Sequence, residues 1–545
     1  MKKSWLLILS VIMAALMVVA CSNDDESTSK TGENNTKAST KKDGPFVYVA
    51  QQVVGTVDPA KHTDETELIS ILNTYDPLVY PKIEEGVMDP GPHLATEWTV
   101  SEDGKTYTFD LRDDVTFQSG NQFTANDVVY SIERMIAIQQ GFSWLWKGVL
   151  EPENVKAISD TQVEFTLNNA YAPFVSTLTQ LFIVDSELLK ENTVDGSYGE
   201  FGDYGQAYLE NNVAGSGPYK LTEWNRGSHL NFSKNDSYWK GWKDDQLDEV
   251  QMKIVTEQAT VKTMLNSGDA DMIHQWLTVD AYEEFKKAKG IVVEEASSVQ
   301  LQHIPINMAK APTDDINVRK AILYAFDYDV ANNQILNGAT QAVGPVPIAV
   351  TGHNDDIQPY KRDIEKAKEY LAKSKYSGDE LTVEFMYLAD TPSQRQLAQL
   401  VQSNLQEIGL KVELNGVPWT TVTESTTTPE TTPHMVVISD TLKYPHLDSH
   451  TYGIYHPSAH GSYRSSSWYD DAATTKVLES ARNSIDPDEQ LAFYKEAQAL
   501  INENAPSIYV ANPNHRIAYR DYVDGYTYVG ILGYDVGFYY LSLKK

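Results

Sequence analysis

Hydrophobic and polar positions alternate along most of the chain in a way that predicts strands and helices in turn. The segment 45–51, PFVYVAQ, is typical of a strand that enters a loop. Residues 106–111 alternate apolar and polar side chains behind a group of turn-forming residues, so we expect a hairpin there. A run with helical period follows over 128–135, and either Thr124 or Asn126 is the expected helix cap.

Further along the chain, helical and strand-like patterns succeed one another. We expect helices at 318–325, 364–373, 393–408 and 487–501, with strand-like pieces at 381–386 and 410–414. Such alternation predicts an α/β fold, in which helices pack on sheets, rather than a helical bundle or a β-sandwich.

The first residues have the pattern of an export signal. Two lysines precede an apolar run over 5–20 that is too short to span a bilayer comfortably. We therefore expect a signal peptide at 1–20. The stretch Val18-Val19-Ala20-Cys21 resembles the lipobox of bacterial lipoproteins, and Cys21 is the single cysteine of the chain. The resemblance implies that Cys21 carries a lipid, although a leftover core cysteine is the alternative.

Residues 22–44 contain no large apolar side chain. Such a composition cannot offset the entropy that ordering costs, so we expect 21–44 to be a flexible, lipid-anchored tether. Together, the signal and the tether predict a protein held at the outer face of the cell membrane, as on a Gram-positive-like surface.

Charge and length narrow the possible functions. The chain has 44 Lys and Arg against 76 Asp and Glu, a formal net charge of -32, so its surface repels nucleic acid. A nucleic-acid function is therefore not expected. A chain of 545 residues exceeds what one hydrophobic core usually supports, which predicts two or three domains.

Motifs of catalysis and of structural metal binding are missing. The sequence has no His-Glu-x-x-His pair, no Cys/His ladder, no Gly-x-Ser-x-Gly elbow and no Walker loop. We expect no enzymatic activity, no metal and no cofactor. Binding of a nickel chelate stays open through His274, through His303, or through the cluster His446, His450, His456 and His460. The irregular spacing of that cluster favours a polar loop over a metal site.

Five ordered stretches of the chain form a recognisable set of landmarks. They include AGSGPYKLTEW at 214–224 and INMAKAPTDDINVRKAILYAFD at 306–327. The others lie at 94–135, 363–371 and 399–414. In this order they resemble family 5 of the bacterial solute-binding proteins, the peptide, nickel and oligosaccharide receptors of ABC importers, and the resemblance extends over nearly all of the chain after Gly44.

The resemblance implies a two-lobed periplasmic-binding-protein-like fold of the class II type, which closes at a hinge and carries an inserted α/β domain. We expect lobe I to comprise 45–80, 182–298 and 507–545. The inserted domain would then occupy 81–181, and lobe II 299–506.

The resemblance also implies the function of an extracytoplasmic receptor, which binds a solute between its lobes and delivers it to the permease and ATPase subunits of an importer. The ligand contacts both lobes only in the closed form and so stabilises it. An oligopeptide is the first expectation for the ligand, and an oligosaccharide or another organic solute is the alternative. We expect a monomer. A surface-anchored hydrolase and a sensor of peptide signals are further alternatives.

Several residues match positions at which relatives contact their ligands. For each of them a structural role, such as a helix cap, an apolar helix face or a strand end, is the competing interpretation. These residues are Thr63, Asp64, Glu65, Phe142, Trp144, Gln275, Trp276, Trp419 and Tyr509.

One position departs from the pattern of peptide-binding relatives, in which an aspartate that binds the peptide ammonium precedes a Tyr-Pro pair. Here Lys443 precedes Tyr444-Pro445, and two ammonium groups would repel each other in a desolvated cleft. Asp440 could supply the missing charge if the loop is rearranged. Otherwise Lys443 suits an anionic or hydroxyl-rich ligand, and tryptophans could stack on sugar rings.

Overall fold

The computed structural model describes residues 43–82, 89–531 and 533–544. The expected signal peptide, Cys21 and the expected tether up to residue 42 lie outside the described residues. Among the helices of the described part, none is long and apolar enough to cross a membrane.

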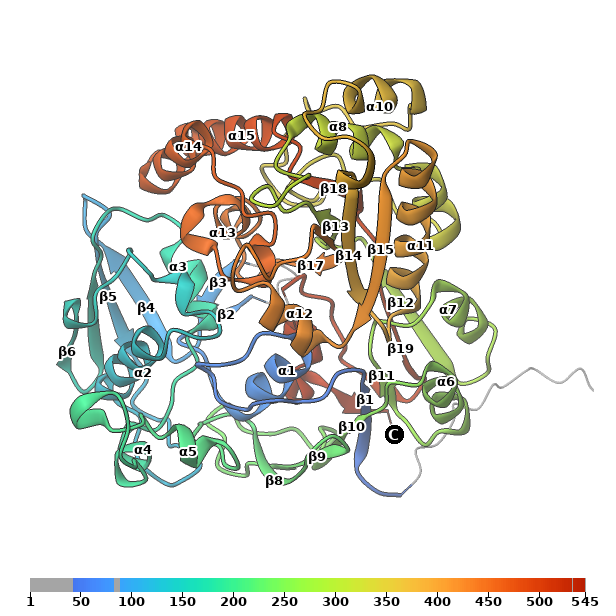
Figure 1. Ribbon diagram of the computed structural model, residues 1–545. Coiled ribbons are helices and arrows are strands. Elements are labelled where there is room, and N and C mark those ends of the chain that lie inside the picture. Colours follow the sequence, from blue (N-terminus) through green and yellow to red (C-terminus); the bar gives the residue numbers. More distant parts are fainter. Residues whose placement is uncertain (1–42, 83–88, 532, 545) are drawn as a thin grey trace, which may run out of the picture. The chain divides into compact units, whose positions relative to one another are not determined.

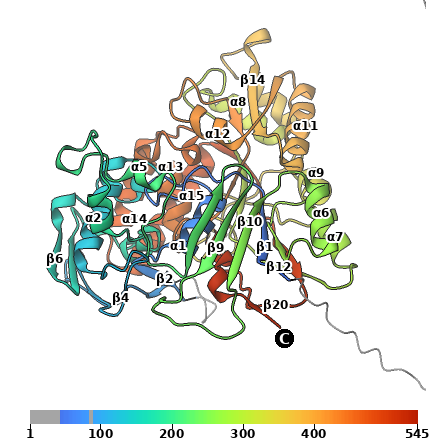
Figure 2. The same ribbon diagram turned by 90° about the horizontal axis from the view of Figure 1, so that it is seen from below.

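The first large sheet has seven strands in the order β12-β19-β11-β1-β10-β9-β8. Its strands are β1 (Phe46–Ala50), β8 (Tyr219–Asn225), β9 (His229–Lys234), β10 (Glu249–Ile254), β11 (Met272–Ile273), β12 (Ile291–Ala296) and β19 (His515–Arg520). Central β1 pairs in parallel with β10 and β11, whereas the other pairings are antiparallel. Figure 2 shows β9, β10 and β1 side by side. Three distant sections of the chain therefore share one sheet.

Strand β1 is apolar on both faces because both faces of its sheet are covered. Tyr48 packs in a core cluster with residues of β8, β9 and β10 and with Phe538. Its neighbour Val49 points to the other face, where α6 (Gln258–Ser267) and α7 (Val279–Phe285) pack. A strand buried on both sides needs an unbroken apolar run, which is what the segment 45–51 supplies.

A second group of elements forms two smaller sheets. Strands β14 (Thr382–Leu388), β15 (Lys411–Val417) and β16 (Met435–Val436) are parallel in the order β15-β14-β16, and α11 (Pro392–Glu407) lies against them (Figure 1). Strands β13 (Leu301–Pro305), β17 (Ile438–Asp440) and β18 (Ser507–Ala511) form an antiparallel sheet in the order β17-β13-β18. One hydrophobic cluster joins β13, β14, β18, α8 (Ile316–Ala325) and α11.

A third group lies within the segment 81–181. Strands β4 (Ala95–Val100), β5 (Thr106–Leu111), β6 (Val155–Ser159) and β7 (Gln162–Thr166) form an antiparallel sheet in the order β4-β5-β7-β6. Helix α2 (Ala125–Ile138) packs on this sheet, and α3 (Phe174–Thr177) follows it in the chain. These elements share a hydrophobic cluster with α1 (Glu65–Thr74).

The remaining α-helices and strands lie outside these three groups. The helices are α4 (Ser186–Glu191), α5 (Gln206–Leu209), α9 (Tyr328–Val330), α10 (Ile364–Leu371), α12 (Trp419–Ser425), α13 (Tyr452–Tyr455), α14 (Ala472–Asn483) and α15 (Pro487–Glu503). The strands are β2 (Val79–Pro81), β3 (Pro90–Pro92), β20 (Val523–Asp524) and β21 (Ser542–Leu543), which form two-stranded pairs β2-β3 and β20-β21.

The predicted α/β fold is confirmed, and local signals place several elements as expected. The hairpin β4-β5 turns at Gly104, whose φ of 68° lies in the left-handed region that glycine adopts without strain. At α2, Thr124 rather than Asn126 is the cap, and it forms a capping box with Asp127. Each signal acts within a few residues, so the sequence alone suffices to read it.

The strand β18 pairs with β13, and its apolar side chains Ile508 and Val510 pack in the cluster of α8 and α11. The chain therefore stays in the sheet of β13 up to Ala511, and the lobe boundary expected at residue 507 stays a prediction.

In the threonine-rich stretch 420–432, two hydroxyl groups donate to backbone carbonyls four residues earlier in the chain. It begins within α12, and the Thr426 hydroxyl donates to the Val422 carbonyl over 2.9 Å. The Thr432 hydroxyl likewise donates to the Thr428 carbonyl over 2.6 Å, and both threonines are fully buried. With these two threonines buried, the stretch packs as part of the fold.

Candidate ligand-binding pocket

A pocket opens at the carboxyl ends of parallel strands from two different sheets. On the side of the seven-stranded sheet it is lined by residues that follow β1 and β11 and by the start of α1: Gln51, Gln52, Thr63, Asp64, Glu65 and Trp276. In α/β sheets this strand end is the usual place of ligand sites.

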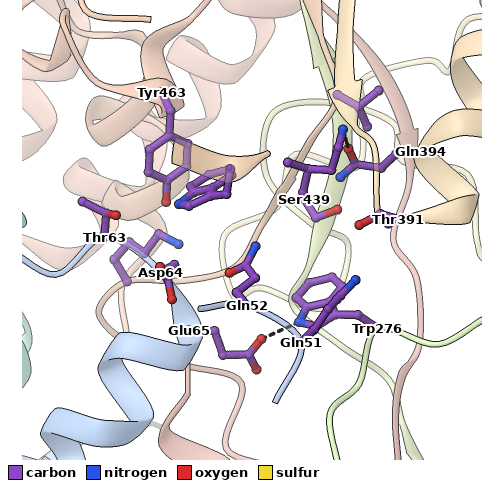
Figure 3. A pocket seen from close by; sticks show the side chains of 14 residues that line it. Gln51, Gln52, Thr63, Asp64, Glu65, Trp276, Thr391, Gln394, Ser439 and Tyr463 are labelled. Atoms are coloured by element: carbon purple, nitrogen blue, oxygen red, sulfur yellow. Dashed lines mark hydrogen bonds between the residues drawn. The ribbon is translucent and has the colours of Figure 1, made fainter. Parts of the chain in front are cut away.

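The opposite wall comes from the β14-β15-β16 sheet and its neighbours. It consists of Leu388, Thr391, Gln394, Trp419, Val437, Ser439, Lys443 and Tyr463. Figure 3 shows several of these side chains facing the residues of α1 and Trp276 across the pocket. A ligand in this space would therefore touch both walls at once.

The start of α1 is fixed by a network of caps. The Asp64 carboxylate accepts a hydrogen bond from the Glu67 backbone N–H over 3.0 Å, and Glu67 in turn accepts one from the Thr63 N–H over 2.9 Å. Asp64 is therefore a helix cap and also lines the pocket, and its contact with a ligand stays a prediction. Burial raises the pKa of the Asp64 carboxyl to about 6.

Glu65 is held by two donors. Gln275 Nε2 and Trp276 Nε1 each lie 2.6 Å from one of its carboxylate oxygens, and Figure 3 shows the bond from Trp276. Burial, together with the nearby charge of Asp535, raises the pKa of Glu65 to about 7 in spite of these donors. The clamp fixes the Trp276 indole at the pocket wall.

Trp419 lies on the other wall, as the first residue of α12. Its ring meets that of Tyr463 edge to face, with the centroids 4.7 Å apart. Among the described residues, its indole N–H finds no hydrogen-bond partner. The pocket thus has an aromatic side chain with a fixed orientation on each wall.

Asp440 is the centre of a buried ion cluster. Arg464 donates to one of its oxygens from Nε over 3.0 Å and from Nη2 over 2.6 Å. Lys443 Nζ lies 3.1 Å from the other oxygen, and the side chains of Asp440, Lys443 and Arg464 are almost fully buried. Although burial alone would raise the pKa of Asp440, the charges of Arg464 and Lys443 hold it well below the usual range.

The predicted repulsion at Lys443 is thereby resolved within the protein. Lys443 lines the pocket, and its ammonium is paired with Asp440. Asp440 does not line the pocket, and its carboxylate is already bound by two cations. In this arrangement Asp440 is unavailable to a ligand ammonium, because no side of the carboxylate is left without a cation.

Two further predicted residues lie in the core instead of at the pocket. The Tyr444 hydroxyl donates to Asp448 over 2.5 Å, in the hydrophobic cluster that includes the inserted domain. The Tyr509 hydroxyl bonds to that of Tyr455 over 3.0 Å beside α14 and α15. A match in sequence position does not by itself bring a side chain to the pocket surface.

The remaining predicted residues line neighbouring cavities. Phe142 and Trp144 lie at a second cavity between the segment 81–181 and the segment 423–464. Gln275 lines a third cavity on the far side of Trp276. Thr63 belongs to both the pocket and the second cavity.

Sequence reasoning missed over half of the pocket residues. Gln51 and Gln52 directly follow β1, which ends at Ala50, and Gln394 lies in the first turn of α11, the helix after β14. The signal that could have found them is their place immediately after parallel strands. Ser439 and Tyr463 carry no such local signal.

The histidines do not form a metal centre. Among the described residues, no group of three or more His, Cys, Asp or Glu side chains could hold a metal ion. Burial lowers the pKa of His274 and His450 to about 3, which keeps them neutral in the core.

The chain is similar in sequence and in structure to several known proteins. The "Probable D,D-dipeptide-binding periplasmic protein DdpA" of Escherichia coli K12 is 28% identical over 478 residues, which cover 87% of this chain and 89% of that protein. "Heme-binding protein A" of Haemophilus influenzae is 26% identical over 563 residues and 98% of each chain. The structure of the ABC transporter-associated periplasmic binding protein DppA from Helicobacter pylori, in complex with peptide STSA, superposes with a TM-score of 0.81 at 26% identity, covering 92% of this chain and 98% of that one.

A two-lobed α/β fold with a pocket at the junction of its sheets defines a solute-binding protein. The family described as "Bacterial extracellular solute-binding proteins, family 5 Middle" matches residues 89–462. The chain belongs to this family, so the resemblance found in the sequence is confirmed.

Proposed function

We propose that this chain is the solute receptor of an ABC importer and that its ligand is a peptide. The observation that carries the proposal is a pocket with walls from both lobes, which offers charges of both signs. Asp64 and Glu65 contribute carboxyl groups and Lys443 an ammonium group. A zwitterionic ligand such as a peptide has matching groups at its two ends.

The names of similar proteins support a peptide as the ligand. One is named for D,D-dipeptides, and the Helicobacter pylori structure holds the peptide STSA. Another is named for heme, so the family fold alone does not fix the ligand.

Within the pocket we assign the ligand ammonium to Asp64. Asp440 is neutralised by Arg464 and Lys443, and Glu65 is saturated by Gln275 and Trp276. Asp64 receives only backbone N–H groups, and its carboxyl lines the pocket. An ammonium beside it would favour the charged form of a carboxyl that burial makes costly to ionise.

The wider setting follows the family. Lobe I is assigned to 45–80, 182–298 and about 512–545, lobe II to 299–511, and the inserted domain to 81–181. Closure of the lobes on the ligand is the signal to the permease, and the ligand leaves unchanged. Cys21 carries the lipid that holds a monomeric receptor at the outer face of the membrane.

An oligosaccharide is the second candidate. Trp276 and Trp419 present rigid aromatic rings on opposite walls, a surface on which sugar rings stack. The Asp64 carboxyl favours the peptide, because a neutral sugar supplies no cation to stabilise its charged form.

Two neighbouring residues give a matched test. Gln52 lines the pocket, whereas Val53 is 53% exposed and does not line it. We expect Gln52→Trp to fill the pocket and abolish peptide binding in calorimetry, whereas Val53→Trp retains it. Equal peptide affinity of the two variants would contradict the pocket assignment, and binding of oligosaccharides but of no peptide would contradict the ligand class.

A further inference from the structure

A second cavity of about 870 Å³ lies between the inserted domain and lobe II. Its inserted-domain wall includes Gln140, Phe142 and Trp144, just after α2. Its lobe II wall includes Thr427 and Arg464. The cavity is thus bounded mainly by the inserted domain and lobe II, with Lys61 and Thr63 of lobe I at its edge.

The pocket and the second cavity adjoin each other. Thr63, at the start of α1, and Tyr463 line both of them. A ligand that leaves the pocket between these two residues therefore enters the second cavity rather than a packed core.

Their sizes differ in a way that limits the ligand. The pocket has a volume of about 70 Å³, whereas sites that enclose a small molecule usually measure roughly 300–1,000 Å³. The second cavity, which adjoins the pocket, lies within this range. A peptide that begins at Asp64 soon fills the pocket, and the second cavity is the adjoining space in which it can continue.

Arg464 offers a donor there. Its Nε and Nη2 are committed to Asp440, and Nη2 also donates to the Ser449 carbonyl over 2.6 Å. Its Nη1 has no hydrogen-bond partner in the described part of the chain, although the side chain is 1% exposed. A buried guanidinium N–H without an acceptor is costly, and a carbonyl or carboxylate oxygen of a ligand would satisfy it.

We propose that the second cavity is the binding site for the distal part of a peptide of several residues, and that Arg464 Nη1 donates to an oxygen of that part. This inference rests on the proposed peptide ligand. It adds that the receptor selects for length, since a dipeptide cannot occupy both spaces.

The experiment measures competition by mixed-sequence pools of dipeptides, tetrapeptides and hexapeptides for the full-length protein. We expect hexapeptides to bind at least about tenfold more tightly than dipeptides. Thr427→Trp and Gln140→Trp, which fill the second cavity from opposite walls at exposed positions, should abolish this preference while leaving dipeptide binding intact. Thr428→Trp, at the adjacent exposed residue outside the cavity, should retain it.

A third variant tests the donor. Arg464→Lys keeps a cation beside Asp440 but removes Nη1, so it should weaken hexapeptide binding more than dipeptide binding. Three results overturn the inference alone: equal affinity for all lengths, binding of dipeptides only, or cavity-filling variants that still prefer hexapeptides. Binding of no peptide of any length would overturn the proposed function together with it.

Discussion

Lys443 Nζ lies 3.1 Å from Asp440 Oδ1, with both side chains almost fully buried beneath the pocket wall. The lysine thus occupies the side of the carboxylate that Arg464 leaves open. Within this cluster, the Lys443 ammonium lines the pocket, whereas the Asp440 carboxylate does not. The Asp440 carboxylate is the counter-ion of two buried cations, so the stability of the fold depends on its charge.

Removing that charge should destabilise the protein. In Asp440→Asn, Arg464 and Lys443 remain buried without their counter-ion, and we expect a loss of about 3–5 kcal/mol in the free energy of unfolding. Urea denaturation followed by circular dichroism measures it. Adding Arg464→Met should recover part of the loss, because one unpaired cation is removed. An Asp440→Asn protein as stable as the wild type would refute the role of the cluster.

The assignment of the ligand ammonium to Asp64 can be tested without disturbing the fold. Asn caps helices as well as Asp does, and it removes the cost of ionising a buried carboxyl, so Asp64→Asn should not lower the melting temperature. We expect it to weaken binding of a peptide with a free amino terminus by about tenfold or more, and to leave an N-acetylated peptide unaffected. Asp363→Asn, at the cap of α10 outside the pocket, is the matched control. Equal losses for both peptides would rule out an ammonium contact.

Peptide affinity should depend on pH through the same carboxyl. The pKa of Asp64 is raised to about 6 in the free protein, so below this pH a proton competes with the ligand ammonium. We expect affinity to fall about fivefold between pH 6 and pH 5, as measured by calorimetry. The ionisation of Glu65, with a pKa of about 7, acts in the same direction. In Asp64→Asn the step near pH 6 should disappear, and its persistence there would point to another group.

Stability should fall in acid because several histidines are buried in the neutral form. Burial lowers the pKa of His274 and His450 to about 3 and that of His62 and His303 to about 4. In the unfolded chain these groups take up protons near pH 6.5, so the unfolded state binds more protons between pH 6.5 and pH 4 and gains stability there. Asp64 has the opposite effect, because its raised pKa lets the folded state bind a proton first, and this offsets part of the loss of stability in acid.

Calorimetric unfolding at pH 7.5 and pH 4.5 measures the effect. We expect each of these histidines to contribute roughly 2 kcal/mol to the loss at pH 4.5. His274→Gln should reduce the loss by about this amount, whereas His229→Gln, at a partly exposed position on β9, should not. A melting temperature that stays constant over this range would contradict the account.

The sequence predicted those parts of the fold whose causes are local. Helix α15 was expected at 487–501 and is found at Pro487–Glu503, because a proline in the first turn and an aspartate cap mark its start within a few residues. The short strands β11 and β16 escaped prediction, since two residues give no periodic pattern and only their neighbours in the sheets define them.

The candidate site was predictable only in part, for the same reason. The residues of α1 and Trp276 came from the family resemblance and do line the pocket. The pairing of Asp440 with Arg464 joins residues 24 positions apart through the fold, and no sequence pattern announces it. That pairing decides whether Asp440 can reach a ligand, so the charge of the site could be judged only from the structure.

Native mass spectrometry of the purified full-length protein, repeated after unfolding and refolding, tests the central claim most directly. We predict a co-purified mass that is lost on refolding, that fragments into amino-acid residues and that returns when the peptide is added back. A bound mass that fragments into a ladder of hexoses or pentoses, or that contains a metal chelate, would contradict the claim that this receptor binds peptides.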